Sequence, residues 1–190
     1  MNIAEQGQRT RTDETGKSAS TPFDRTLFEA AEKGNTSDIE KLLSAGANVN
    51  CALDGDGSPL IGAARNGHRA AVDLLLERGA DPNMPVPGDG NPLIMAAREG
   101  HAEIVVALLD GGAKVNQIVP GDENALIQAS SEGHLEVVKL LVARGANVNA
   151  RAWVEEGPRP DGEWRTPLSM ARQGGHQAVV AFLLGAGARE

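Results

Sequence analysis

The chain has 190 residues, a net charge of −8, 41% hydrophobic residues and only 3% aromatic residues. This length suits one domain, and a core almost without aromatic side chains must be built from Ala, Leu, Val and Ile, which favours closely packed helices over a β-sandwich. The acidic balance and the lack of a Lys/Arg run argue against nucleic acid and anionic membranes as partners, and no apolar stretch approaches the roughly 20 residues that span a bilayer.

The first segment of the chain, residues 1–22, is rich in Gln, Arg, Thr, Glu, Gly and Ser. It lacks the apolar region of a signal peptide and has few apolar anchors, so we expect a disordered tail ahead of a folded domain over residues 23–190. The single cysteine, Cys51, excludes an internal disulfide and fits a cytoplasmic protein. An extracytoplasmic location follows instead if the chain is part of a membrane receptor.

A Gly-Ala pair then recurs along the chain at intervals of 33, 33, 33 and 42 residues. The leucine that opens each unit repeats with the same spacing, at Leu27, Leu60, Leu93, Leu126 and Leu168. A fixed period of this length is the signature of a repeat architecture. We therefore predict units at about 24–56, 57–89, 90–122, 123–164 and 165–190, the fourth with nine extra residues before the last unit begins.

The sequence pattern of each unit predicts two helices. A capping residue and a proline, as in Ser58-Pro59, begin the first helix, and the glycine of a Gly-His pair such as Gly67-His68 ends it. The second helix has apolar residues at i, i+3 and i+4, as in Val72, Leu75 and Leu76. A polar segment rich in Gly and Pro follows, which we call a finger because it suggests a hairpin-like turn.

These motifs, with Gly-Ala-Asn-Val-Asn at residues 46–50 and 145–149, resemble the ankyrin repeat over about residues 24–189. The resemblance implies an all-α fold, an α-solenoid of five ankyrin-type helix–turn–helix repeats with hairpin-like fingers. Ankyrin repeats usually place a histidine after Pro-Leu, bonded to the preceding threonine. Here that position holds Ile61, Ile94, Ile127 and Ser169, which predicts the loss of a hydrogen bond and added apolar contact in three units.

Some variants, such as Thr-Pro-Leu-Ser-Met-Ala-Arg at residues 166–172, are also similar to bacterial ankyrin modules, some of them appended to membrane-bound metallopeptidases of the β-lactam-sensor type. The zinc motif His-Glu-x-x-His of those peptidases does not occur in this chain. This resemblance therefore implies, at most, the accessory module of a larger receptor or enzyme.

Histidines and carboxylates are the candidates for chemistry. The four histidines, all at the start of a second helix, lie one repeat apart, too far to share a metal ion, so we interpret them as structural caps. The finger carboxylates, among them Glu123 and Glu163, are expected to form a solvated acidic rim that steers a basic partner. We predict no catalytic residue, no metal site and no cofactor.

The long finger, residues 150–166, differs from the others because it holds both tryptophans of the chain, Trp153 and Trp164. Trp and Arg dominate interface hot spots, so the finger could form a lip over a partner. Alternatively, the two rings pack on each other and stiffen a hairpin. Both interpretations can hold together.

We therefore expect a monomeric scaffold or adaptor that binds a protein partner, favoured to be basic, with an accessory or sensor domain of a larger membrane receptor or enzyme as the alternative. By analogy with the family, the contacts come from finger tips and from the ends of first helices lining a concave groove. The expected contact residues are Asp54, Asp56, Arg65, Asn66, Asp89, Arg98, Glu99, Asp122, Glu123, Ser131, Glu132, Trp153 and Trp164.

Overall fold

The computed structural model describes residues 22–53, 57–86, 88, 90–119, 123–154 and 162–189. Within these residues ten helices form five pairs, and a two-stranded hairpin precedes the last pair. The elements are α1 (Pro22–Glu32), α2 (Thr36–Ser44), α3 (Pro59–Arg65), α4 (Arg69–Glu77), α5 (Pro92–Arg98), α6 (Ala102–Asp110), α7 (Ala125–Ser131), α8 (Leu135–Ala143), β1 (Ala152–Val154), β2 (Glu163–Arg165), α9 (Pro167–Gln173) and α10 (Gln177–Gly185).

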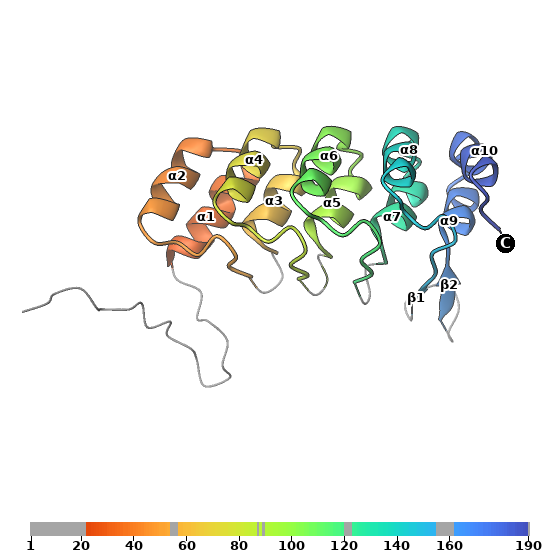
Figure 1. Ribbon diagram of the computed structural model, residues 1–190. Helices are drawn as coiled ribbons and strands as arrows, with labels where there is room; N and C mark the ends of the chain where they lie inside the picture. The colour runs from red at the N-terminus through yellow and green to blue at the C-terminus, as the bar shows by residue number, and fades with distance from the viewer. Residues whose placement is uncertain are drawn as a thin grey trace, which may run out of the picture.

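The helix pairs stack in chain order from the N-terminal to the C-terminal end of the solenoid (Figure 1). First helices contact the first helices of neighbouring units, and second helices contact second helices, so that every unit packs on the one before it. The bases of the fingers and the β1–β2 hairpin project from one edge of this stack (Figure 1). The predicted all-α repeat solenoid is confirmed.

Small and aliphatic side chains fill the core between the units. Ala63, Ala96 and Ala129 are fully buried where successive first helices meet, and Leu75, Leu108 and Leu141 are buried on the second helices. Alanine lets the first helices approach closely, since it has no side chain beyond Cβ. A core of this kind needs few aromatic residues, in agreement with the composition of the chain.

The predicted caps begin the first helices. The side chains of Ser58, Asn91 and Asn124 each accept a hydrogen bond from the backbone N–H three residues later. The last unit departs from our expectation, because Ser169 does not lose the hydrogen bonding of the residue it replaces. Its Oγ accepts from the Thr166 N–H at 2.9 Å, and its own N–H donates to Thr166 Oγ1 at 3.0 Å, which forms a capping box.

Isoleucine at the same position has the predicted apolar role. Ile61 packs with Val86 of its own unit and Met95 of the next unit, and Ile127 packs with Ala152 of its own unit and Met170 of the next. These two contacts attach a finger base to the first helices of the units on either side of it. In the three middle units, burial of a β-branched side chain therefore replaces a polar turn contact.

Asparagines form a second connection between the units. Asn83 Oδ1 accepts from the Lys114 N–H at 2.7 Å, and its Nδ2 donates to the Gly112 carbonyl at 3.0 Å. Asn50, Asn116 and Asn149 make the same pair of bonds to their following units. The Asn that closes Gly-Ala-Asn-Val-Asn thus satisfies backbone groups of its neighbour, which explains its place in the repeat.

Candidate interaction surface

The predicted contact positions at the ends of the first helices recur with the same backbone geometry. Asn66, Glu99 and Glu132 follow α3, α5 and α7 directly, and all three side chains are exposed. The residues just before them differ in exposure, since Arg98 is exposed whereas Arg65 and Ser131 are partly buried. Arg65 also lies 3.8 Å from a carboxylate oxygen of Glu32 in the preceding unit.

The histidines hold these helix ends in place, and here our interpretation of them as caps needs correction. None of the four rings accepts or donates a cap hydrogen bond to its own helix. Instead, Nε2 of His101 lies 3.1 Å from the Arg65 carbonyl oxygen, and Nε2 of His134 lies 2.9 Å from that of Arg98. Because a carbonyl only accepts, Nε2 carries the proton in these contacts.

The same contact joins His68 to Glu32 at 2.8 Å and His176 to Ser131 at 2.8 Å. Each ring therefore ties the last turn of one first helix to the next unit. It also passes close to the glycine that ends that helix, since a Cβ on Gly67 would lie 2.9 Å from the His101 ring. Gly67 has φ +79°, so glycine is needed there both for the left-handed backbone and for space.

Among the residues that the structure describes, no group of three His, Cys, Asp or Glu side chains comes together as a metal site would require. Cys51 is buried, and burial, together with the charge of Asp24, raises the pKa of its thiol to about 12. A thiol with such a pKa is protonated at neutral pH and is a poor nucleophile.

Four of the predicted finger carboxylates, Asp54, Asp56, Asp89 and Asp122, lie outside the described residues. Glu123 is described, and the expectation that it is solvated was wrong, because only 3% of it is exposed. It occupies the place of Gly57 and Gly90 at a finger base, with φ +65°. A left-handed backbone is unfavourable for glutamate, so contacts of its side chain must stabilise it there.

Arg165, from the next unit, supplies that contact. Its Nη1 lies 2.9 Å from Glu123 Oε1, and its Nε lies 3.1 Å from Glu163 Oε1. Burial alone would lower the pKa of the guanidinium, but the hydrogen bonds to the two carboxylates outweigh it and raise the pKa above its usual value. This ion pair connects the base of the finger before α7 to the hairpin before α9.

The β1–β2 hairpin presents two different faces. Ala152 and Val154 are buried, whereas Trp153 and Trp164 form a cross-strand pair on the outer face. The two rings lie edge to face with centroids 5.3 Å apart, so the predicted packing of one ring on the other is confirmed. They nevertheless stay 45% and 53% exposed, which leaves a large aromatic surface at one end of the solenoid.

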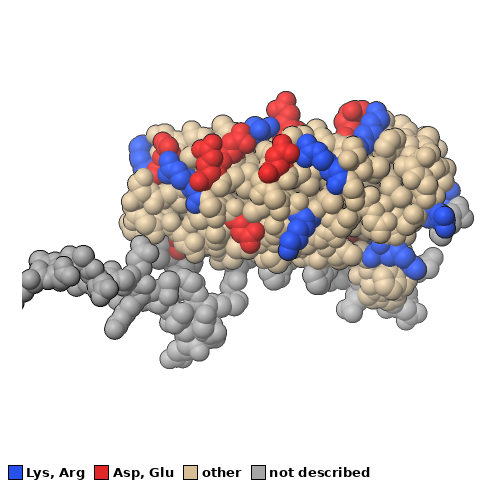
Figure 2. Space-filling model, in the orientation of Figure 1, with Lys and Arg blue, Asp and Glu red and all other residues tan. Residues whose placement is uncertain are grey.

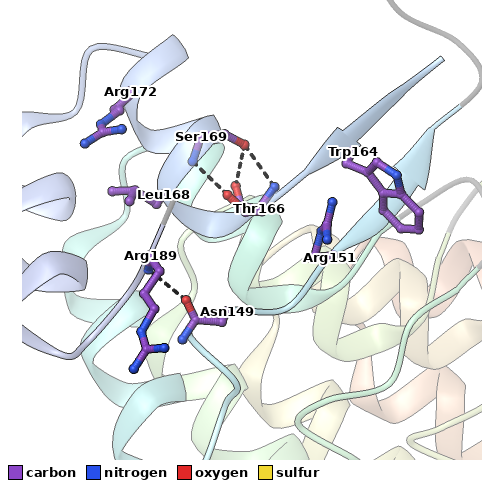
Figure 3. A pocket seen from close by; sticks show the side chains of 8 residues that line it. All are labelled: Asn149, Arg151, Trp164, Thr166, Leu168, Ser169, Arg172 and Arg189. Carbon is purple, nitrogen blue, oxygen red and sulfur yellow. Dashed lines mark hydrogen bonds between the residues drawn. The ribbon is translucent and has the colours of Figure 1, made fainter. Parts of the chain in front are cut away.

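Beside the hairpin lies an open pocket of about 640 Å³ whose lining residues are drawn in Figure 3. Arg151 stacks over Trp164 with its guanidinium carbon 4.8 Å from the ring centroid. Arg172, from α9, and Arg189, which follows α10, also line this pocket. Sequence reasoning did not select these last two arginines. The available signal was that Arg172 occupies a repeat position held by Ala64, Ala97 and Ser130 in the units before it.

The protein-family model described as ankyrin repeats (3 copies) matches residues 27–119, 87–152 and 120–189. The chain belongs to the ankyrin-repeat family. No curated protein matches it. The match extends to the repeats alone and lends no support to the resemblance to modules of metallopeptidases.

Ankyrin repeats generally mediate protein–protein interactions, and proteins of this family are typically scaffolds without enzymatic activity. The ankyrin-repeat stack described above contains no helix long and apolar enough to cross a membrane. Membership of the family gives the chain the coarse function of a protein-binding module.

Proposed function

We propose that this ankyrin-repeat chain is a scaffold or adaptor that binds a protein partner through its finger side and the ends of α3, α5 and α7. One observation carries this proposal. The backbone at Asn66, Glu99 and Glu132 is constant, whereas the pair formed by each residue and the one before it changes from Arg-Asn to Arg-Glu to Ser-Glu. A rigid frame that displays varied chemistry is how repeat proteins build a specific surface.

The frame is held by the histidine contacts to Arg65, Arg98 and Ser131, which anchor the carbonyl groups beside these positions. Preorganised positions lose little conformational entropy on binding, so they favour affinity. Glu99 and Glu132 together with the net charge of −8 favour a partner with basic residues at these contacts.

The proposal is tested by reversing charge on this surface. We expect Glu99→Lys combined with Glu132→Lys to abolish capture of partner proteins by the tagged chain from an extract of its source cells, as measured by quantitative mass spectrometry. The matched control is Glu103→Lys combined with Glu136→Lys, which makes the same change in charge at exposed positions of α6 and α8. Thermal melting followed by circular dichroism confirms that both variants fold.

A protein set that both double variants retain or lose alike would refute the proposed surface.

The hairpin tryptophans need a separate variant. Replacing residues 150–166 with a short finger would also remove Arg165 and leave the Glu123 carboxylate without that cation, so a loss of binding would be ambiguous. Trp153→Ser keeps that ion pair and changes only the exposed face of the hairpin.

A further inference from the structure

The pocket beside the hairpin occupies the outer end of the last unit. Its residues come from segments that are distant in sequence. Asn149 and Arg151 precede and begin the hairpin, Trp164 lies on β2, and Arg172 and Arg189 come from α9 and the segment after α10. Figure 3 shows these side chains together with the Thr166–Ser169 capping box, whose two residues also line the pocket.

In every earlier unit the two corresponding positions are buried. Ile127 and Ser130, for example, are fully buried where the fifth unit packs on the fourth. In the fifth unit these two positions hold Ser169 and Arg172, both of which are exposed. Packing a further unit of the same kind there would bury a guanidinium, which is costly, so this face is adapted to solvent or to a polar ligand.

A solvent-facing end requires polarity but does not require one sign of charge. The fifth unit, residues 165–190, nevertheless contains three arginines and only one acidic residue, Glu190, in a chain with a net charge of −8. Arg165 is paired with carboxylates, whereas Arg172 and Arg189 line the pocket. None of the described residues that line the pocket is acidic. In Figure 2 the acidic side chains lie over the earlier units, whereas the C-terminal end shows only basic ones in this view. The pocket lining is therefore a positive region on an acidic protein.

The shape of this region indicates the kind of anion. The guanidinium groups of Arg172 and Arg189 point in different directions, and that of Arg151 lies beside Trp164 (Figure 3). They are spread along the depression and do not converge on one point, which suits several carboxylates in succession better than a single small ion. Arginine pairs with carboxylates in bidentate geometry, and an exposed Trp adds apolar contact.

We infer that this pocket binds an extended Asp/Glu-rich segment of a partner protein, whose carboxylates pair with Arg151, Arg172 and Arg189 and whose backbone lies against Trp164. The inference rests on the proposed function only in that the occupant is a protein segment. The surface is distinct from the helix ends with Glu99 and Glu132, where a basic partner is expected. One scaffold would thereby hold groups of opposite charge at two places.

The two tryptophans make the test direct, because the only indole rings of the chain lie at this site. Trp153→Phe leaves Trp164, which lines the pocket, as the single reporter. In this background a short synthetic peptide rich in Asp and Glu should change the Trp164 fluorescence in a saturable manner. Binding should weaken as salt is added, since the contacts are charged. The same peptide with Asn and Gln in place of Asp and Glu should not bind.

Charge reversal locates the site. We expect Arg189→Glu and Arg172→Glu each to weaken binding by about tenfold or more. Lys114→Glu is the matched control, because Lys114 occupies the same repeat position as Arg189, two residues after the glycine of Gly-Ala, and both backbone N–H groups donate to the Asn of the preceding finger. This control should alter the affinity by less than about twofold.

Three results would overturn the inference. Equal binding of the amide peptide would show that carboxylates are not recognised, and an equal loss in Lys114→Glu would show general attraction without a site. Sedimentation showing that the wild type self-associates while Arg189→Glu does not would identify a second copy as the occupant. If Arg172→Glu fails to fold, Arg189→Glu still decides the outcome. Glu99 and Glu132 are unchanged in all these variants, so failure of the acidic-peptide inference does not affect the proposed function. Failure of the charge-reversal test at Glu99 and Glu132 likewise does not affect this inference.

Discussion

The ion pair between Glu123 and Arg165 offers the sharpest test of how the long finger is held. Removing the cation with Arg165→Met leaves a buried carboxylate on a left-handed backbone. Breaking a buried pair in this way costs roughly 3–5 kcal/mol. The Arg165 and Glu163 side chains are 22% and 17% exposed, so water reaches part of the cluster. We therefore expect a loss at or just below the lower limit of that range, about 2–3 kcal/mol.

Replacing the other partner of the ion pair, Glu123, should cost much less stability. Glu123→Gly removes the carboxylate and restores the residue that Gly57 and Gly90 provide at the same position, where φ is positive. Relief of backbone strain is worth roughly 1–3 kcal/mol. Arg165 keeps its contact with Glu163 at 3.1 Å. We expect Glu123→Gly to lie within about 1 kcal/mol of the wild type, and the double variant to resemble Glu123→Gly.

Urea unfolding measures both effects. Circular dichroism follows the helices, and tryptophan fluorescence follows the hairpin, because both indoles lie there. In Arg165→Met the fluorescence transition should move to lower urea than the helical transition, since a repeat stack can lose one unit before the others. The reasoning is refuted if Arg165→Met costs less than about 1 kcal/mol or if Glu123→Gly is equally damaging.

Three further predictions concern the stack. His101→Ala should destabilise the protein by about 1–2 kcal/mol in urea unfolding, because it leaves a helix-end carbonyl without its donor; no measurable loss would contradict a structural role. Leu108→Ala and Leu183→Ala, both at fully buried side chains, should each cost roughly 2–5 kcal/mol, whereas the 47% exposed Leu184 should tolerate alanine. Leu108→Ala, in a middle unit, should cost more stability than Leu183→Ala in the last unit. In the folded state the pKa of the Cys51 thiol is raised from an ordinary 9.0 to about 12. Ionisation of the thiol therefore favours the unfolded state, and the free energy of unfolding should fall as the pH rises from 9 towards 12. Rapid alkylation of the native protein at pH 8 would contradict this prediction.

Much of the fold was predictable because the repeats of one chain can be compared with one another. Ser58 and its equivalents mark the helix starts, Gly67 and its equivalents mark the ends, and Ala63 with Leu75 recur where the units touch. Each of these features depends on local backbone geometry or on contact with the adjacent unit. Contacts that are the same in every unit leave the same residues in every copy, so the period of 33 residues specified the solenoid.

The directions of particular side chains and the contacts outside the repeat pattern were decided by the tertiary structure. Glu123 resembled other finger carboxylates in sequence, and only the approach of Arg165, 42 residues later, shows that it is buried and paired. The histidines stood at helix starts, yet their rings reach carbonyl groups 36 or 45 residues away. Arg151, Arg172 and Arg189 become neighbours only when the hairpin, α9 and the last segment fold together. A repeat pattern records which contacts recur from unit to unit, whereas the direction of a single side chain and its distant partner depend on the packed arrangement of the whole stack.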